Sequence, residues 1–335
     1  MSKKKIIFLF LIFTCLLSKN FSYDKKRALL FYAFKKKVCF YNAKRKDLRI
    51  LPVEITANSS INSLFYFKNK LYLATNDGVE IWDVSDFYHP FRISSFSEEY
   101  ANDIKVINSF LFLATKKEGL KIYEIKDISF PKEIAKIATL GTPMNIFILK
   151  NYLYLADKEG GLRIIDIKDI YNPREVGYYK EVSPILDVYG EDNFVYLACG
   201  RKGLLILDTK LKSYPEEIIQ YSSEGYTTTL FFSKPYLYLA NNEGGLRIID
   251  IKEPYSPKEI YYDDEYEVKD IFVNFPYAYV DTENGLKVIK IGEKRELLSF
   301  LTNLSYLFIL LIVIFYLFYR FNKMIKELKE KRMIR

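Results

Sequence analysis

The sequence contains one histidine, one tryptophan and three cysteines in 335 residues. Zinc sites need several histidines or cysteines at set spacings, and none of those spacings occurs. The single histidine, His89, precedes Pro90 in an expected loop, where we expect a structural or solvated side chain. A hydrolase elbow, a P-loop and a dinucleotide fingerprint are also missing. The sequence therefore has no catalytic motif, and we expect neither an enzyme nor a bound metal or cofactor.

Cysteine is too scarce for a disulfide scaffold. Cys15 lies in the apolar N-terminal stretch, which leaves Cys39 and Cys199 in the body of the chain. These two residues occupy different positions of an internal repeat, so a bond between them would need an unusual coincidence of geometry. We expect two buried free thiols.

The body of the chain also lacks a surplus of either charge. The formal net charge is +8, but Lys3, Lys4 and Lys5 contribute +3 of it, and the tail 320–335 has seven Lys or Arg against two Glu. Residues 6–319 therefore carry no net charge. Because nucleic-acid binding needs a basic surface, this distribution argues against DNA or RNA as a partner and points to membrane topology.

The N-terminus has the plan of a secretory signal peptide. Three lysines precede 13 mostly apolar residues, Ile6 to Ser18, a stretch too short to span a bilayer comfortably. We assign residues 1–22 to the signal, with cleavage after Ser18 or Ser22. Two alternatives stay open, which are a lipoprotein modified at Cys15 and an uncleaved signal that serves as a second anchor.

A second apolar segment lies near the C-terminus. Residues 297–319 include no charged side chain over 23 positions, which is long enough for a transmembrane helix, and a buried core helix is the alternative. The basic segment 320–335 follows at once, so the positive-inside rule places it in the cytoplasm. We therefore expect a single-pass protein of the cytoplasmic membrane whose residues 23–296 face away from the cytoplasm.

One repeat runs through most of the chain. The stretch GGLRIIDIK occurs at residues 160–168 and again at 244–252, and KGLLILDTK at 202–210 keeps the same pattern midway between them. The period is therefore about 42 residues, and such even spacing over so long a stretch does not arise by chance. Seven copies of the first apolar run begin at residues 30, 71, 111, 153, 195, 237 and 278.

Each copy predicts four short antiparallel strands. Two apolar runs rich in Ile, Tyr and Phe flank a turn that contains glycine, and a second hairpin passes through an Asp-to-Pro loop such as 166–173. Four strands in about 42 residues is the plan of a β-propeller blade. We expect an all-β propeller of seven blades over residues 23–296. Six complete blades plus a partial one is the alternative, because the inner strand of the first copy, expected at 22–28, is mostly polar.

The runs GLRIID (161–166 and 245–250) and their variants resemble the LVIVD-repeat family of bacterial and archaeal surface proteins. The resemblance covers residues 30–296 and implies a β-propeller at the cell surface, without any assigned reaction. The first copy departs from the pattern because Lys37 replaces the turn glycine, and in the last copy Lys290 replaces the acidic residue. WD-type propellers have similar repeat lengths, but their Gly-His and Trp-Asp signatures are absent.

Two series of polar residues recur from copy to copy. An acidic residue ends the third run of five copies, and we expect its carboxylate to accept backbone N–H groups of the next turn, with a repeated metal ligand as the alternative. A small polar residue lies eight positions before each second strand and should face one mouth of the central channel. There it either binds a ligand or caps the strand. The acidic series is Asp83, Glu124, Asp166, Asp208 and Asp250, and the channel-mouth series is Ser63, Asp103, Asn145, Asp187, Thr229 and Asp270.

These features favour a membrane-anchored extracytoplasmic propeller that acts as a binding or scaffold module at the cell envelope. The expected partners are the lipid bilayer and an envelope protein. The alternative is a propeller hydrolase of the lactonase or glycan-acting type with its site at the channel mouth. That alternative would need a convergent set of carboxylates or a metal, and the expected channel mouth supplies three aspartates.

Overall fold

A computed structural model describes residues 19–43, 48–181 and 184–291 of the chain. The chain divides into two compact units, residues 1–273 with 279–287, and residues 274–278 with 288–335. The contacts and surfaces discussed below are those of the first unit. No helix in the described part of the chain is long and apolar enough to cross a membrane. The expected transmembrane segment 297–319, the tail 320–335 and residues 1–18 of the expected signal lie outside that part.

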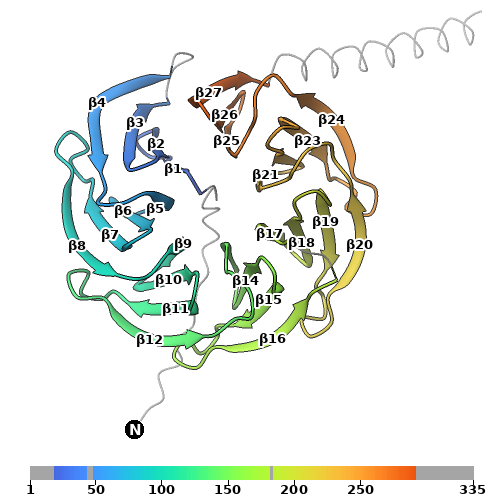
Figure 1. Cartoon of the computed structure of the whole chain (residues 1–335), viewed down its shortest axis with the longest axis horizontal. Coiled ribbons are helices and arrows are strands. Elements are labelled where there is room, and N and C mark those ends of the chain that lie inside the picture. Colours follow the sequence, from blue (N-terminus) through green and yellow to red (C-terminus); the bar gives the residue numbers. More distant parts are fainter. Residues whose placement is uncertain (1–18, 44–47, 182–183, 292–335) are drawn as a thin grey trace, which may run out of the picture. The chain divides into compact units, whose positions relative to one another are not determined.

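The described strands form seven antiparallel sheets in chain order around a central axis (Figure 1). This arrangement confirms the predicted seven-bladed β-propeller. In each sheet the first strand is innermost and later strands lie progressively further out. The first three blades are β1 (Phe21–Asp24), β2 (Leu29–Phe34), β3 (Lys37–Asn42) and β4 (Arg49–Thr56); β5 (Ile61–Phe67), β6 (Lys70–Thr75), β7 (Gly78–Asp83) and β8 (Phe91–Ser97); and β9 (Ala101–Ile107), β10 (Phe110–Thr115), β11 (Gly119–Glu124) and β12 (Lys132–Ile137).

The last blade differs from the others, since it has three strands among the described residues where we expected four. The remaining blades are β13 (Asn145–Leu149), β14 (Tyr152–Asp157), β15 (Gly161–Asp166) and β16 (Arg174–Tyr179); β17 (Asp187–Glu191), β18 (Phe194–Ala198), β19 (Leu204–Asp208) and β20 (Glu216–Tyr221); β21 (Thr229–Ser233), β22 (Tyr236–Ala240), β23 (Leu246–Asp250) and β24 (Lys258–Asp263); and β25 (Asp270–Asn274), β26 (Tyr277–Thr282) and β27 (Gly285–Lys290).

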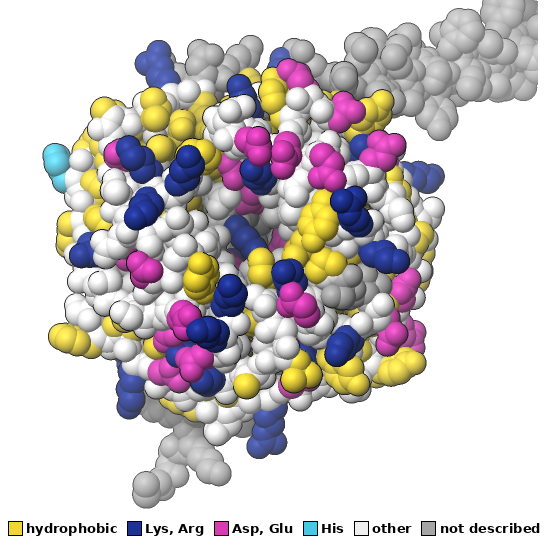
Figure 2. Space-filling view, viewed as in Figure 1, with side chains coloured by type: hydrophobic (Ala, Val, Ile, Leu, Met, Phe, Trp, Pro, Cys, Tyr) yellow, Lys and Arg dark blue, Asp and Glu magenta, His cyan; other side chains and the backbone are white. Residues whose placement is uncertain are grey.

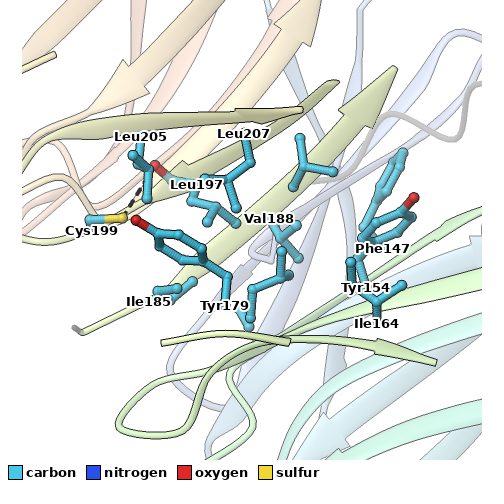
Figure 3. Close-up of a cluster of buried hydrophobic side chains, with 13 residues drawn as sticks. Phe147, Tyr154, Ile164, Tyr179, Ile185, Val188, Leu197, Cys199, Leu205 and Leu207 are labelled. Carbon is cyan, nitrogen blue, oxygen red and sulfur yellow. Dashed lines mark hydrogen bonds between the residues drawn. The ribbon is translucent and has the colours of Figure 1, made fainter. Parts of the chain in front are cut away.

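The core lies between neighbouring blades. The second and third strands of a blade are buried on both faces, which explains their nearly continuous apolar runs. Figure 3 shows one such layer, where Tyr154 and Ile164 of the fourth blade pack in the same cluster as Val188 and Leu205 of the fifth. Cys199 belongs to this layer and is fully buried, and burial raises the pKa of its thiol to about 12. Cys39 is partly buried, and neither cysteine is in a disulfide.

Six blades have glycine at the turn between the second and third strands, and Gly161 illustrates the reason. Gly161 has a φ of +87°, and a Cβ built on it would lie 2.2 Å from the carbonyl oxygen of Tyr179 in the adjacent strand. A side chain at this position would therefore meet both backbone strain and a steric clash. The glycine at this turn has a positive φ in six blades, namely Gly78, Gly119, Gly161, Gly203, Gly245 and Gly285.

The acidic series that ends the third strands organises the loop that follows. Oδ1 of Asp166 accepts the backbone N–H of Lys168 at 2.8 Å, and Asp83, Asp208 and Asp250 make the same bond two residues ahead. This confirms the predicted turn-stabilising role for the four aspartates. Glu124 differs, because its carboxylate accepts the Tyr171 hydroxyl instead.

The inner strand of the first blade is shifted from the expected 22–28. The strand is Phe21–Asp24, and the polar residues 25–28 form the hairpin loop after it. Phe21 lies just before the expected segment 22–28, is fully buried, and supplies an apolar contact that the mostly polar segment lacks. The first blade is therefore complete, and the six-bladed alternative is wrong.

Candidate functional site: the channel-mouth ring

The six predicted channel-mouth residues all lie at or near the start of an innermost strand. In five blades the residue pairs with an alanine of the second strand, as Asp187 does with Ala198. The six side chains are buried, with at most 4% of each residue exposed. The structure therefore places them at equivalent positions at one end of the blades, which we call the ring end. The five pairs are Ser63 with Ala74, Asp103 with Ala114, Asn145 with Ala156, Asp187 with Ala198 and Thr229 with Ala240.

Asn20 is the seventh member of this ring, and the sequence pattern missed it. The backbone N–H of Ala33 donates to the carbonyl oxygen of Asn20 at 2.8 Å, so Asn20 occupies the position that faces the repeat alanine. Counting eight residues back from Leu30 reaches Ser22 instead. The loop 25–28 is two residues longer than the loop 68–69 of the next blade, and this extra length displaces the equivalent residue.

The three ring aspartates bridge neighbouring blades. Oδ2 of Asp187 in the fifth blade accepts the backbone N–H of Leu230 in the sixth at 2.7 Å. Asp103 makes the same contact to Ile146 of the fourth blade at 2.8 Å. Each bridge therefore links the inner strands of two neighbouring blades through a carboxylate oxygen.

The third bridge joins the last blade to the first. Oδ2 of Asp270 accepts the backbone N–H of Asn20 at 2.6 Å. Aspartates thus link the third blade to the fourth, the fifth to the sixth and the seventh to the first. Their carboxylate oxygens are occupied by donors of the protein itself.

A lysine neutralises the first of these aspartates. Nζ of Lys105 lies 2.7 Å and 2.8 Å from the two carboxylate oxygens of Asp103, and its side chain is 5% exposed. The hydroxyl of Ser63 donates to the same carboxylate at 2.5 Å. Lys105 follows Asp103 by two residues, so both side chains lie on the same face of β9. The pair is buried, which fits the rule that buried charges occur with partners.

Asp187 is a buried ring acid with a raised pKa. Burial is the main cause that raises its pKa to about 7, and the charge of Asp270 raises it further. The charge of Lys19 and the N–H of Leu230 act in the opposite direction. Asp187, Asp270 and Lys19 therefore interact electrostatically at the ring end. Side chains of both charge signs surround the central hollow of the face in Figure 2.

The first and last blades are joined by a polar clasp around Asp281. Its Oδ2 accepts the side-chain N–H of Asn20 at 2.8 Å, and its Oδ1 accepts the hydroxyl of Tyr32 at 2.5 Å. Burial raises the pKa of Asp281, and burial together with the Asp281 hydrogen bond raises that of Tyr32. Phe21 stacks on Tyr32 with ring centroids 5.0 Å apart and adds an apolar layer beside the clasp.

This geometry assigns the ring aspartates a clear structural role, while ligand binding by the six residues stays a prediction. Within residues 19–43, 48–181 and 184–291, no group of three His, Cys, Asp or Glu side chains is arranged to hold a metal ion. His89 is exposed and its Nδ1 lies 2.8 Å from the Asp86 carboxylate, in agreement with the expected solvated loop position.

Comparison with known proteins identifies the repeat and the fold. The LVIVD repeat matches four times, over residues 99–139, 140–181, 186–223 and 224–262. No curated protein matches the chain.

Solved structures with similar folds are distant in sequence. A chain of the mitotic checkpoint complex superposes with a TM-score of 0.68 at 10% identity, covering 84% of this chain and 93% of that one. Saccharomyces cerevisiae Sqt1 gives 0.63 at 12% identity, with coverages of 84% and 97%. The computationally designed protein Ika8 gives 0.62 at 11% identity, with coverages of 83% and 84%. At such identities these likenesses show the fold alone.

Proposed function

This chain is a seven-bladed β-propeller that carries LVIVD repeats, and we propose that it is a membrane-anchored binding or scaffold module of the cell envelope. The observation that carries the proposal is the use of the ring carboxylates. Asp103, Asp187 and Asp270 accept backbone N–H groups of neighbouring blades, and Asp103 also pairs with Lys105. The channel-mouth carboxylates, which a hydrolase would need for catalysis, therefore link neighbouring blades. The loops at the two ends of the blades are left to make contacts.

The membrane anchor is the second part of the proposal. The apolar segment 297–319 and the basic segment 320–335 support a single span with a cytoplasmic tail. The basic and apolar N-terminus supports export of the propeller. With both features, the propeller stands on the outer side of the cytoplasmic membrane and engages a protein partner there.

Cross-linking in intact cells tests the proposal. The full-length chain, expressed at its natural level, is treated with a membrane-impermeant cross-linker and purified under denaturing conditions. We expect a specific adduct with an envelope protein, and the same adduct should be lost after substitutions in partner-contacting loops. A chain that cross-links to no other protein, or that reacts only after the membrane is permeabilised, would contradict the scaffold role.

A further inference from the structure

Five consecutive blades each expose one aromatic side chain in the loop between their third and fourth strands. In each loop the aromatic residue lies either one or two positions before the loop proline. All five residues are more than half exposed, although most large hydrophobic residues of the repeat are buried. We call this set the aromatic crown: Tyr88 at 52%, Phe130 at 78%, Tyr171 at 51%, Tyr214 at 67% and Tyr255 at 62% exposure.

The loops hold the crown residues in fixed positions. Oδ1 of Asp169 accepts the backbone N–H of Tyr171 at 3.1 Å, and Asp86 makes the same bond to Tyr88 at 3.0 Å. Such Asx turns restrain the backbone next to the exposed ring. In the third blade the N–H of Phe130 donates to the carbonyl oxygen of Asp127 at 3.2 Å. The aromatic side chains are thus presented on ordered turns.

Two crown residues also rest on the preceding blade. The ring of Tyr171 meets Phe110 edge-on at 6.2 Å between centroids, and the ring of Tyr255 meets Phe194 in the same way at 5.9 Å. A small recess lined mainly by apolar side chains, including Phe110, Phe112 and Ile170, adjoins the contact of Tyr171 with Phe110. The surface around Tyr171 therefore combines an exposed ring with an apolar recess.

The loops around the crown are basic, whereas those at the ring end are acidic. Loops between first and second strands and between third and fourth strands lie at the same end of the blades, the crown end, because neighbouring strands are antiparallel. In the first unit the described loops of the crown end contain 11 Lys or Arg against five Asp or Glu. Those of the ring end contain nine against 12. The net charges are therefore +6 and −3, although the body of the chain is neutral.

The chain also leaves the propeller in the direction of the crown end. In every blade the third strand runs from the ring end to the crown end, and β27 is the third strand of the last blade. Residues 288–296 then separate Lys287 from the apolar segment 297–319. Nine residues reach about 30 Å at most when extended. The expected membrane span can therefore begin no further than about 30 Å from Lys287.

We propose that the crown end docks on the anionic lipid surface of the membrane that residues 297–319 span. This inference rests on the proposed membrane anchor and adds an orientation to it. Tyrosine side chains suit the membrane–water interface, where the ring is apolar and the hydroxyl stays hydrated. Lysines around them attract anionic headgroups. The acidic ring end then faces away from the lipid and is left for a protein partner.

Tyrosine footprinting of the full-length chain tests the docking. The protein is incorporated into bilayers of phosphatidylcholine, or of phosphatidylcholine mixed with phosphatidylglycerol, and compared with detergent micelles. Tyr178 and Tyr262 are matched internal controls, because they lie on outer strands and are 61% and 58% exposed. We expect modification of Tyr171 and Tyr255 to fall severalfold in the anionic bilayer, while the two controls keep their micelle rates.

Variants separate the contributions of rings and charges. Tyr88→Ser/Phe130→Ser/Tyr214→Ser should restore modification of Tyr171 and Tyr255 in the anionic bilayer, and Lys126→Glu/Lys210→Glu should do the same. The matched variant Tyr178→Ser/Tyr262→Ser should leave the protection unchanged. Raised salt should weaken the protection, since it screens attraction to anionic headgroups.

Three outcomes would overturn the docking. If crown and control tyrosines are modified equally in every bilayer, the crown end does not dock on lipid. If the crown is protected as strongly in the neutral bilayer as in the anionic one, anionic lipid has no role in the docking. If the crown is protected in native membranes, tested as a further sample, but in neither lipid bilayer, a protein partner covers this end instead. The anchor is tested separately, because a chain without a span is extracted by alkaline carbonate whatever its crown does.

Discussion

Asp281 is the residue at which the repeat departs furthest from its own pattern. The other six blades have alanine at this position, where the second strand faces the ring residue. In the last blade the backbone N–H of Lys269 donates to the carbonyl oxygen of Asp281 at 2.8 Å, just as that of Leu186 donates to Ala198 in the fifth blade. One substitution in an otherwise regular position thus provides the acceptor for Asn20 and Tyr32 of the first blade.

Replacing Asp281 by the alanine of the other blades should therefore destabilise the protein. Asp281→Ala leaves the Tyr32 hydroxyl and the Asn20 amide with their acceptor removed, and we expect a loss of about 2 kcal/mol in unfolding free energy. Chemical denaturation of the purified chain measures this loss. Tyr32→Phe removes one of the stranded donors, so the double variant should lose less than the sum of the single losses. Strict additivity would show that the clasp does not couple the two residues.

The pH dependence of stability should report on Asp187. Its folded-state pKa is raised from 3.8 to about 7 mainly by burial. A carboxylate whose pKa is higher in the folded state than in the unfolded state binds its proton more tightly when the protein is folded. Stability is therefore highest below about pH 4 for this group and falls as the pH rises through the window to about 7.

Asp187→Asn should remove that contribution. Between pH 4 and 7 the wild type should lose up to about 1.4 kcal/mol per pH unit relative to the variant. Urea denaturation at several pH values gives the difference, with Asp127→Asn in an exposed loop as the control. If the two curves stay parallel over this window, Asp187 is ionised in the folded state and the inferred electrostatics of the ring end are wrong.

At the residue level, the sequence located six ring positions because a fixed count from each second strand worked wherever the hairpin loop had its usual length. It missed Asn20 because loop 25–28 is longer. The pairing of Asp103 with Lys105 could have been predicted, since residues two apart share a face of a strand. The hydrogen bonds to the next blade could not have been predicted, because the period of the repeat does not give the register between separate sheets.

At the level of elements, β1 distinguishes between the two expected cleavage sites of the signal peptide. Residues 19–22 belong to the first blade, where Phe21 is fully buried and Asn20 bonds to Asp270 and Asp281. The carbonyl oxygen of Lys19 accepts the N–H of Leu64 in the second blade at 2.9 Å. Cleavage after Ser22 would remove all these contacts, whereas cleavage after Ser18 would keep them.

The mature chain should therefore begin at Lys19. Intact-mass measurement and N-terminal sequencing of protein purified from membranes check this directly. A chain that begins at Tyr23 would show that the first blade tolerates the loss of its inner strand, and a chain that retains Met1 would support the uncleaved-anchor alternative. Truncated protein starting at Tyr23 provides a stability control, and we expect it to unfold at a clearly lower denaturant concentration.

The last blade has three strands among the described residues, whereas the sequence pattern predicted four. The polar outer strands lie at the edge of each sheet and carry a weak apolar signal, as the exposed positions of β16 and β20 illustrate. Their presence in the second to sixth blades follows from the loop before them, which ends in proline. In the last copy Lys290 replaces the acidic residue that begins this loop in other copies, and the described residues of this blade form three strands.

At the level of the whole molecule, a neutral sum conceals a separation of charge. Because consecutive loops alternate between the two ends of the blades, a sequence total averages basic crown loops with acidic ring-end loops. The period and strand order were readable from apolar runs alone, and with them the fold. The charge asymmetry became visible only after each loop was assigned to an end.

The proposed topology gives the last prediction. If the propeller lies outside and the tail inside, a membrane-impermeant amine reagent applied to intact cells should label propeller lysines and spare tail lysines. Lys117 is a suitable reporter, because its side chain is 64% exposed and it lies in a ring-end loop, away from the expected lipid surface. Lys323 and Lys331 report on the tail, and permeabilised cells show that they are reactive. Mass spectrometry of the isolated chain should find Lys117 modified in both samples and the tail lysines modified only after permeabilisation. Labelling of the tail in sealed cells, with Lys117 protected, would reverse the orientation, whereas equal protection of all three lysines would place the whole chain inside the cell.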